Sequence, residues 1–220
     1  MLGVLLLLGL LAVAVLGLRA LEHDVFDGGQ SSTPPPPTPV RTVKLLVPEG
    51  FALRDIARRV PTIGLSRKSY RKAVAAAHPP AGYKATGKER LGMEGFLFPA
   101  TYELTRPVSG KVLVAEQLEA FRRETAGVDF SYARKHGLTR YDVLIIASMI
   151  EREAAAPVDR GKISAVIYNR LHDHDLLGID ATVQYAAGSW GPVTGHELAS
   201  DSPYNTRRFK GLPPTPICNP

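Results

Sequence analysis

The sequence is most informative about the fold at residues 139–153, which read TRYDVLIIASMIERE. Thr139 and Asp142 form a capping-box pattern at the start of this stretch, and residues 143–150 are apolar almost without interruption. A helix that is apolar nearly all round belongs in the centre of a core. The stretch therefore predicts a buried helix that ends in the charged triplet 151–153.

Glu151, at the end of this helix, is the candidate catalytic residue. It follows Ser148 by three positions and Leu144 by seven, so its carboxyl lies on the side of the buried stripe. Partial burial disfavours the charged form of a carboxyl and raises its pKa, as general acid catalysis requires. The alternative is structural: Glu151 and Glu153 solvate the last turn beside Arg152, and helical periodicity alone favours this alternative.

A strand, a turn and two helices are predicted for residues 41–92, on the N-terminal side of the apolar helix. Residues 42–47 have the alternation of a half-buried strand, and the apolar spacing of residues 53–60 predicts a helix. Ser66 is a suitable N-cap for a second helix that continues to about Ala77. This β-α-α order resembles the LysM module, a fold often used to bind glycans that contain N-acetylglucosamine.

The rest of the chain is predicted to be mainly helical. Residues 96–104 are rich in aromatic side chains and predict either a strand or a buried loop, and helical spacing follows from about residue 111 and again over residues 163–171. The expected fold class is α+β, in which the small β-α-α module precedes a mainly helical domain over residues 93–220.

The first 40 residues differ in composition from the rest. Residues 1–18 carry no charged side chain, and the length of this run approaches the ~20 residues that cross a bilayer. A cleaved signal peptide is the alternative, but no basic residue precedes the apolar run and residues 18–20 make a poor cleavage site. We predict a transmembrane anchor over residues 1–21, followed over residues 22–40 by a linker that includes the run SSTPPPPTP.

Composition argues against several classes of protein. The chain has 220 residues, a net charge of +6 that is spread over separate Lys and Arg, and one cysteine, Cys218. Diffuse positive charge favours anionic surfaces such as lipid headgroups or wall polymers, and no nucleic-acid-binding motif accompanies it. A single cysteine forms no intrachain disulfide, and the tract at residues 172–175 lacks further ligands at a metal-binding spacing. We expect no cofactor, no metal and no nucleic acid partner.

Six short motifs resemble the YceG-like family of endolytic murein transglycosylases. They follow the order and approximate spacing of the family, so that together they are specific although each alone is weak. The motifs are EGFLFP at 94–99, ASMIERE at 147–153, VIYNRL at 166–171, DATVQY at 180–185, SPYNT at 202–206 and GLPP at 211–214.

The resemblance implies an activity and a site. In that family the first glutamate of the Glu-x-Glu motif is catalytic, a role that falls on Glu151 here and leaves Glu153 structural. The implied reaction cleaves the bond between N-acetylmuramic acid and N-acetylglucosamine in peptidoglycan and leaves a 1,6-anhydro end. The remaining motifs supply the candidate substrate-binding residues, which are Glu94, Asn169, Arg170, Asp180, Tyr204, Asn205 and Thr206.

Several of these candidates have structural alternatives. Arg170 and the asparagine before it could pair with Asp173 or Asp175, and Asp180 is a suitable N-cap for a short helix. The loop at 202–206 could cap its own backbone, although the resemblance favours a place for it in the cleft of the catalytic glutamate.

Two other classes of function also remain open. The first is a two-carboxylate muramidase in which Asp180 or Glu94 is the partner of Glu151. The second is a non-catalytic, membrane-tethered protein that binds the wall.

The sequence also departs from the family pattern. Ala100 stands where the family usually has Asp, Ala181 where it has Pro, Arg207 where it has Tyr and Thr215 where it has Gly. Family members also continue beyond the last motif, so we expect residues 93–220 to lack a C-terminal segment of the domain. The substitutions affect the details of substrate recognition more than the class of activity.

We predict a single-pass protein of the cell membrane whose domain lies on the extracytoplasmic side, because the implied polymer lies there. Membrane lipid, through residues 1–21, and other cell-wall synthesis proteins are then expected partners. Protease added to intact spheroplasts should digest the domain while a cytosolic marker survives. Protection of the domain until detergent is added would contradict this orientation.

Overall fold

The computed structural model describes residues 41–85 and 91–220, and Val40–Pro220 forms one compact unit. The predicted anchor and linker over residues 1–40 lie outside the described residues. No helix in the described ranges is long and apolar enough to cross a membrane. The predicted α+β class is confirmed by the elements β1 (Thr42–Val47), α2 (Leu53–Arg59), η1 (Val60–Ile63), α3 (Arg67–Ala75), β2 (Ala100–Thr105), α4 (Gly110–Thr125), α5 (Ser131–Lys135), α6 (Arg140–Glu153), η2 (Pro157–Asp159), α7 (Arg160–His172), α8 (Asp180–Ala187) and α9 (Gly195–Leu198).

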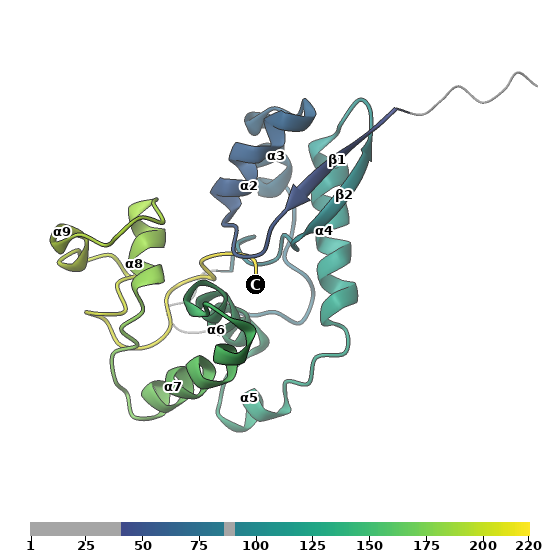
Figure 1. The fold of residues 1–220 in the computed structure, drawn as a ribbon. Coiled ribbons are helices and arrows are strands. Elements are labelled where there is room, and N and C mark those ends of the chain that lie inside the picture. The colour runs from purple at the N-terminus through teal and green to yellow at the C-terminus, as the bar shows by residue number, and fades with distance from the viewer. Residues whose placement is uncertain (1–40, 86–90) are drawn as a thin grey trace, which may run out of the picture. The chain divides into compact units, whose positions relative to one another are not determined.

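The sheet consists of two antiparallel strands, β1 and β2, paired along their whole length. Leu45 and Val47 of β1 are buried, whereas Leu46 is half exposed, which is the alternation that the sequence predicted. α4 packs against both β2 and α3, so β1, β2 and the three helices α2 to α4 form one group (Figure 1). β1 and β2 lie on the two sides of the domain boundary expected between residues 92 and 93, and they share one sheet. The boundary itself stays a prediction.

Local signals set the ends of the neighbouring elements. The Ser66 side chain caps α3 by accepting a hydrogen bond of 3.1 Å from the backbone of Ser69, as predicted. α3 ends at Ala75, slightly before the predicted end. The stretch 96–104 contains both of the predicted alternatives: Phe96 is fully buried in a turn, and the chain then enters β2.

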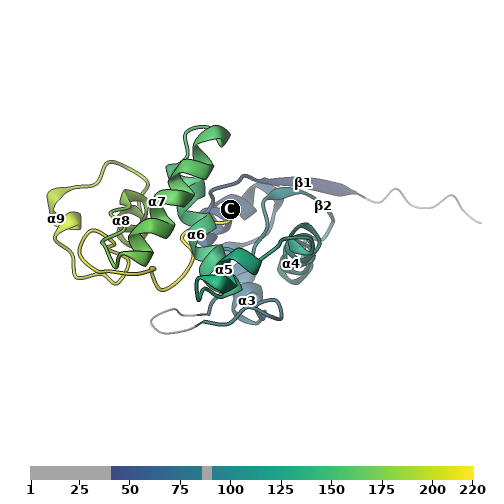
Figure 2. The same ribbon diagram turned by 90° about the horizontal axis from the view of Figure 1, so that it is seen from below.

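α6 is the buried helix expected from the sequence. The capping box is present, because Thr139 Oγ1 accepts from the amide of Asp142 at 3.1 Å and the Asp142 carboxylate accepts from the amide of Thr139 at 2.7 Å. Ile145 and Met149 are fully buried. α6 packs against α7 and α8, and Figure 2 shows α8 and α9 on the side of α6 away from the sheet.

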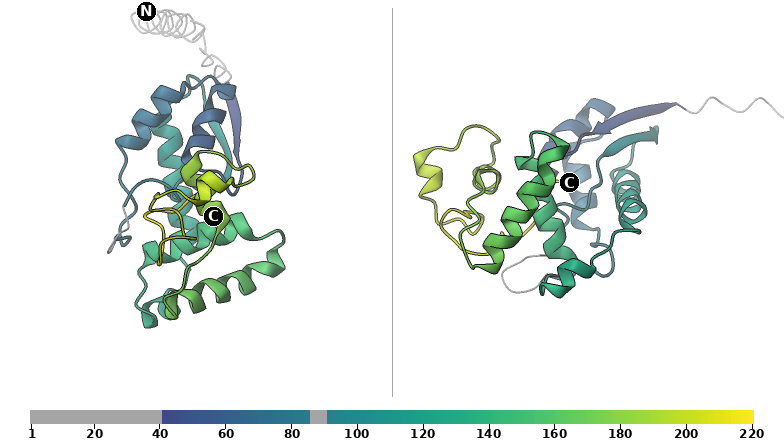
Figure 3. Two further views of the ribbon diagram at one scale, coloured as in Figure 1. Left: turned by 90° about the vertical axis from the view of Figure 1, so that its left-hand side faces the viewer. Right: turned by 60° about the horizontal axis from the view of Figure 1, so that its bottom comes forward.

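The last residues of the chain join α6 to the turn after β1. Asn219 exchanges backbone hydrogen bonds of 2.9 Å with Gly50 and Phe51, and its side chain accepts from the amide of Phe51 at 2.9 Å. The same side chain donates to the carbonyl of Leu97 at 3.2 Å. Figures 1 and 3 accordingly place the C-terminus in the middle of the described unit. The polar contacts of this segment are therefore part of the core.

Gly95 allows this terminal segment to pack closely. Its φ is +86°, and a Cβ at this position would lie 2.8 Å from Pro216 and 3.2 Å from the side chain of Leu144. Left-handed backbone and a contact this short both favour glycine.

We expect Gly95→Ala to reduce the free energy of unfolding by about 2–4 kcal/mol, from left-handed strain and overpacking together. Gly92→Ala is the matched control because a Cβ there meets nothing within 4 Å, and we expect it to stay within about 0.5 kcal/mol of the parent. Urea unfolding followed by tryptophan fluorescence measures both. Equal stability of the two variants would contradict the packing described here.

Candidate active site

Glu151 lies in the last turn of α6, and its side chain is 17% exposed. Burial is the main influence on the pKa of its carboxyl and raises it, the direction predicted from the sequence. The Arg160 guanidinium, 3.0 Å from Oε2 of Glu151, lowers the pKa. Glu49 lies 3.9 Å from the same guanidinium, and its negative charge raises the pKa of Glu151. The proton affinity of Glu151 is thus set by burial acting against Arg160.

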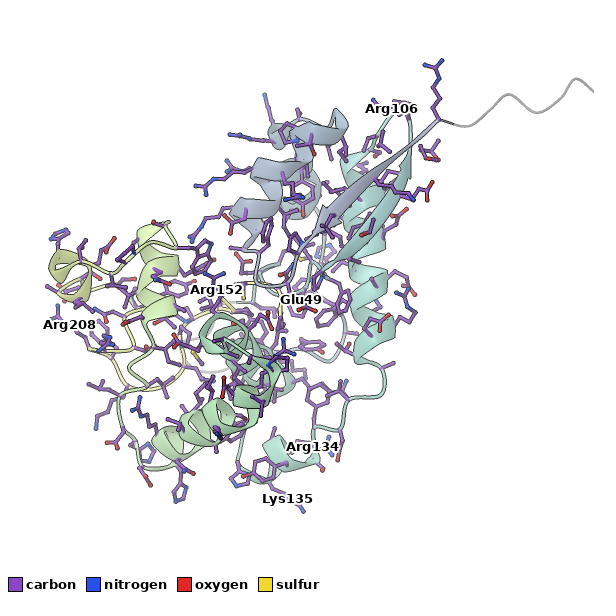
Figure 4. The ribbon with its side chains drawn as sticks, viewed as in Figure 1. Glu49, Arg106, Arg134, Lys135, Arg152 and Arg208 are labelled. Atoms are coloured by element: carbon purple, nitrogen blue, oxygen red, sulfur yellow. The ribbon has the colours of Figure 1, made fainter. Side chains whose placement is uncertain are left out.

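Gly50 brings the turn after β1 close to the end of α6. Its φ is +73°, and a Cβ here would lie 3.5 Å from Nη1 of Arg152 and 3.9 Å from Cγ of Glu151. The left-handed conformation favours glycine at position 50. Because glycine has no side chain, the backbone of the turn comes close to the side chains of Arg152 and Glu151. Figure 4 labels Glu49 and Arg152 in the region where this turn reaches α6.

Trp190, in the segment after α8, is held by α2 and α6. The guanidinium of Arg152 lies 3.9 Å from the centre of the Trp190 ring system, and that of Arg54 lies 4.7 Å from it. Cations at these distances are attracted to the face of an indole. The indole Nε1 donates to the carboxylate of Asp55 at 2.9 Å. These contacts bind the segment after α8 to the side of the site.

A pocket of about 410 Å³ opens beside these residues. Gly50 and Arg152 belong both to this pocket and to the surroundings of Glu151, so the pocket adjoins the candidate catalytic carboxyl. We call it the arginine pocket; its lining is Gly50, Phe51, Asp55, Arg58, Arg59, Arg152 and Trp190.

Glu94, a predicted substrate-binding residue, contacts the start of α2. Its Oε1 accepts from the amide of Leu53 at 2.8 Å, and its Oε2 accepts from the hydroxyl of Tyr185 at 2.9 Å. Burial raises the pKa of Glu94 to about 7, while these hydrogen bonds and Arg54 lower it. Both carboxylate oxygens are occupied by protein groups, so the contacts of Glu94 join α2 to α8.

Cys218 is a buried residue that contacts α6. Its thiol is buried and donates to the carbonyl of Ser148 at 3.3 Å. Burial raises the pKa of this thiol, and the charges of Glu94 and Glu151 both raise it further. Both carboxylates thus act on the proton affinity of this thiol.

Asn205 and Thr206 are buried within their own loop. The Asn205 amide donates to the carbonyls of Leu198 and Ser200, both at 2.9 Å. Thr206 Oγ1 accepts from the amide of Ile179 at 3.0 Å. With exposed fractions of 1% or less, these side chains organise the loop, as in the structural alternative.

Asp180 is the first residue of α8 and not its N-cap, so the capping alternative is wrong; the N-cap is Ile179. The Asp180 carboxylate pairs with the guanidinium of Arg207. Nearby, Glu153 Oε1 accepts from the amide of Ala181 at 3.4 Å, in keeping with the structural role expected for Glu153. Arg207 and Ala181 are both departures from the family pattern, and proline at 181 would have no amide hydrogen to donate.

The other predicted binding residues lie in three different surroundings. Arg170 donates to the carbonyl of Leu177 rather than pairing with an aspartate. Asn169 is exposed and lines a second pocket, between α5 and α7. The Tyr204 ring lies 5.0 Å from the ring of Tyr185, and it thereby joins the group around Glu94.

Apart from Arg152, sequence reasoning missed the residues that surround Glu151 and line the pocket beside it. Arg160 and Glu49 come from separate elements and had no motif to mark them. Trp190 had one signal, since it is the only tryptophan of the sequence. A lone large aromatic residue near glycines is a candidate for a binding surface.

The comparisons with known proteins show the family of the chain. A family model described as the YceG-like family matches residues 30–220. The chain belongs to this family. The crystal structure of a yceG-like protein from Listeria monocytogenes is 31% identical, with a TM-score of 0.68 over 80% of this chain and 62% of that one.

Two relatives are named endolytic murein transglycosylase. The protein of Bacillus subtilis is 39% identical over 131 residues, which cover 58% of this chain and 36% of that protein. The protein of Streptococcus pneumoniae (strain R6) is 30% identical over 228 residues, which cover 91% of this chain and 40% of that protein. The chain therefore spans about two fifths of the length of these curated relatives.

The raised pKa of Glu94 predicts a pH-dependent stability. Between the ordinary value of 4.5 and about 7 the folded state binds more protons than the unfolded state, so stability falls as the pH rises through this window. In the parent, the free energy of unfolding should therefore decrease between pH 5 and pH 8. We expect Glu94→Gln to make this decrease smaller by roughly 1–3 kcal/mol. Urea unfolding at both pH values measures it, with the exposed Glu119→Gln as control. A decline in the Glu94 variant as steep as in the parent would contradict the assignment.

Proposed function

We propose that this chain carries the catalytic site of an endolytic murein transglycosylase and that Glu151 is its acid and base. The observation that carries the proposal is the position of Glu151, partly buried at the end of α6 with a raised pKa and next to the arginine pocket. The names of the relatives and the Glu-x-Glu motif support the same residue.

The reaction needs one carboxyl in two roles. Glu151 first protonates the oxygen that bridges N-acetylmuramic acid and N-acetylglucosamine, as the bond from this oxygen to the muramyl C1 breaks. The resulting carboxylate then accepts the proton of the muramyl C6 hydroxyl while that oxygen bonds to C1. The product is a 1,6-anhydro end, no water is consumed, and Glu151 regains its proton.

Arg160 has a different effect on each step. Its ion pair with Glu151 opposes the neutral form that the first step requires, and Glu49 offers the guanidinium a second carboxylate. A substrate that draws Arg160 away from Glu151 would favour protonation. After the first step, the return of the guanidinium would stabilise the new carboxylate.

The two-carboxylate muramidase is less well supported. Such an enzyme needs a second carboxyl free to act as base or nucleophile. Both oxygens of Glu94 accept hydrogen bonds from the protein, and Asp180 is paired with Arg207. A purely wall-binding role would give no reason for a partly buried carboxyl of raised pKa beside a pocket.

The remaining parts of the chain fit this function as further proposals. An anchor at residues 1–21 would hold the domain near new glycan strands outside the membrane. The unit of β1, α2 and α3 is the part that resembles LysM, and binding of N-acetylglucosamine by this unit would keep the strand in reach of Glu151.

Glu151→Gln should abolish most of the activity of the full-length protein on purified murein. The amide keeps the size of the side chain but has no proton to give, and acid–base catalysis is worth ~10²–10⁴-fold or more when one residue serves both steps. Mass spectrometry identifies the anhydro product, which lacks the water added by hydrolysis. Glu153→Gln is the matched control and should be far milder. Release of anhydro products by a folded Glu151 variant at the parent rate would refute the assignment.

A further inference from the structure

We propose that the arginine pocket binds a carboxylate of the peptide stem carried by the muramyl residue. This inference rests on the proposed function, because it assumes that a muramyl residue is bound at Glu151. It adds a substrate group that the reaction itself does not require.

The charges of the pocket favour an anionic ligand. Arg58, Arg59 and Arg152 face one carboxylate in the lining, that of Asp55. Within residues 41–85 and 91–220, neither Arg59 nor Arg152 has a carboxylate oxygen within 4.0 Å. The pocket therefore holds two guanidinium groups, those of Arg59 and Arg152, that form no ion pair within the described residues.

Asp55 is already committed to the protein. Its Oδ2 accepts from the amide of Ala52 at 3.1 Å and from the indole of Trp190 at 2.9 Å. Its Oδ1 lies 3.3 Å from Arg58, whose side chain is 60% exposed. This carboxylate builds the wall of the pocket and pairs with Arg58, so the guanidinium groups of Arg59 and Arg152 are the ones left without an ion pair in the described residues.

The surroundings of Arg152 also favour an anionic ligand in the arginine pocket. Its Nε is buried and has no hydrogen-bond partner in the described part of the chain, while its guanidinium packs on Trp190. The apolar walls formed by Phe51 and Trp190 lower the local dielectric and strengthen an ion pair made there. Guanidinium groups match the planar, two-oxygen geometry of a carboxylate.

The position of the pocket identifies which carboxylate it would meet. Gly50 and Arg152 are shared between the pocket and the surroundings of Glu151. The peptide stem is attached to the same sugar whose C1 is attacked, through its lactyl group, and it carries free carboxylates. A neutral N-acetylglucosamine unit would leave the cations of the pocket unpaired.

Trp190 makes the proposal measurable, because it is the only tryptophan of the 220 residues and it lines the pocket. The probe is N-acetylglucosaminyl-N-acetylmuramyl tripeptide, which has no bond that the proposed reaction cleaves. We expect tryptophan fluorescence to report binding of the free-carboxylate probe at least about 5-fold tighter than binding of the same probe with its carboxylates amidated. Inorganic phosphate, as a simple anion, should compete only weakly.

The double variant Arg58→Gln/Arg59→Gln should bind both probes equally, while Arg71→Gln, an exposed arginine of α3 outside the pocket, should keep the parent preference. Calorimetry repeats the titrations, so that a fluorescence change is not the sole readout. Equal binding of the two probes by the parent, or an undiminished preference in the folded double variant, would overturn the proposal.

The same protein on purified murein separates this proposal from the function. Anhydro products without a preference for free carboxylates would overturn the stem-binding proposal alone. A preference without anhydro products from the parent would overturn the proposed reaction and leave an anion-binding pocket.

Discussion

The hydrogen bonds of Asn219 connect the parts of the chain on which the site is built. This side chain links the turn at Gly50 and Phe51 to the carbonyl of Leu97, and the residues just before it are bound to Ser148 in the middle of α6. The β1–α2 turn, the loop after Glu94 and α6 are thereby held together at the centre of the unit. A buried amide whose donor and acceptor are both satisfied fixes such an arrangement, because leaving either partner unbonded costs about 1–3 kcal/mol.

Glu94 and Glu151 are both partly or fully buried carboxyls of this unit, but their surroundings differ. Burial raises the pKa of both Glu94 and Glu151. Glu94 receives a backbone amide and a tyrosine hydroxyl on its two oxygens, so its contacts are internal. Glu151 has a half-exposed guanidinium, that of Arg160, as its neighbour and a pocket beside it. A carboxyl beside a half-exposed partner can change its protonation more readily than a carboxyl whose two oxygens are both bonded within the protein.

The features that could be predicted from the sequence are those in which neighbours along the chain interact. The capping box of α6, the Ser66 cap and the alternation of β1 each involve residues within a few positions, so their chemistry is visible in the sequence. The ion pair of Arg160 with Glu151, the bonds of Asn219 and the packing of Trp190 join separate elements and have no local signal. Asn205 and Thr206 show a different limit, since a polar motif that organises a buried loop has the same sequence pattern as one that binds a sugar.

The wall of the arginine pocket depends on how the α8 segment is attached. Its start meets the end of α6 through Glu153 and the amide of Ala181, and its end meets α2 through Tyr185 and Trp190. These attachments are polar or cation–π contacts, which are individually weaker than the apolar packing around α6. The family's usual proline at 181 would remove one of them, so in this chain alanine gives the start of α8 an additional hydrogen bond to α6. The segment that carries Trp190 is therefore held by contacts with both α6 and α2, and these contacts position the wall that Trp190 contributes to the pocket.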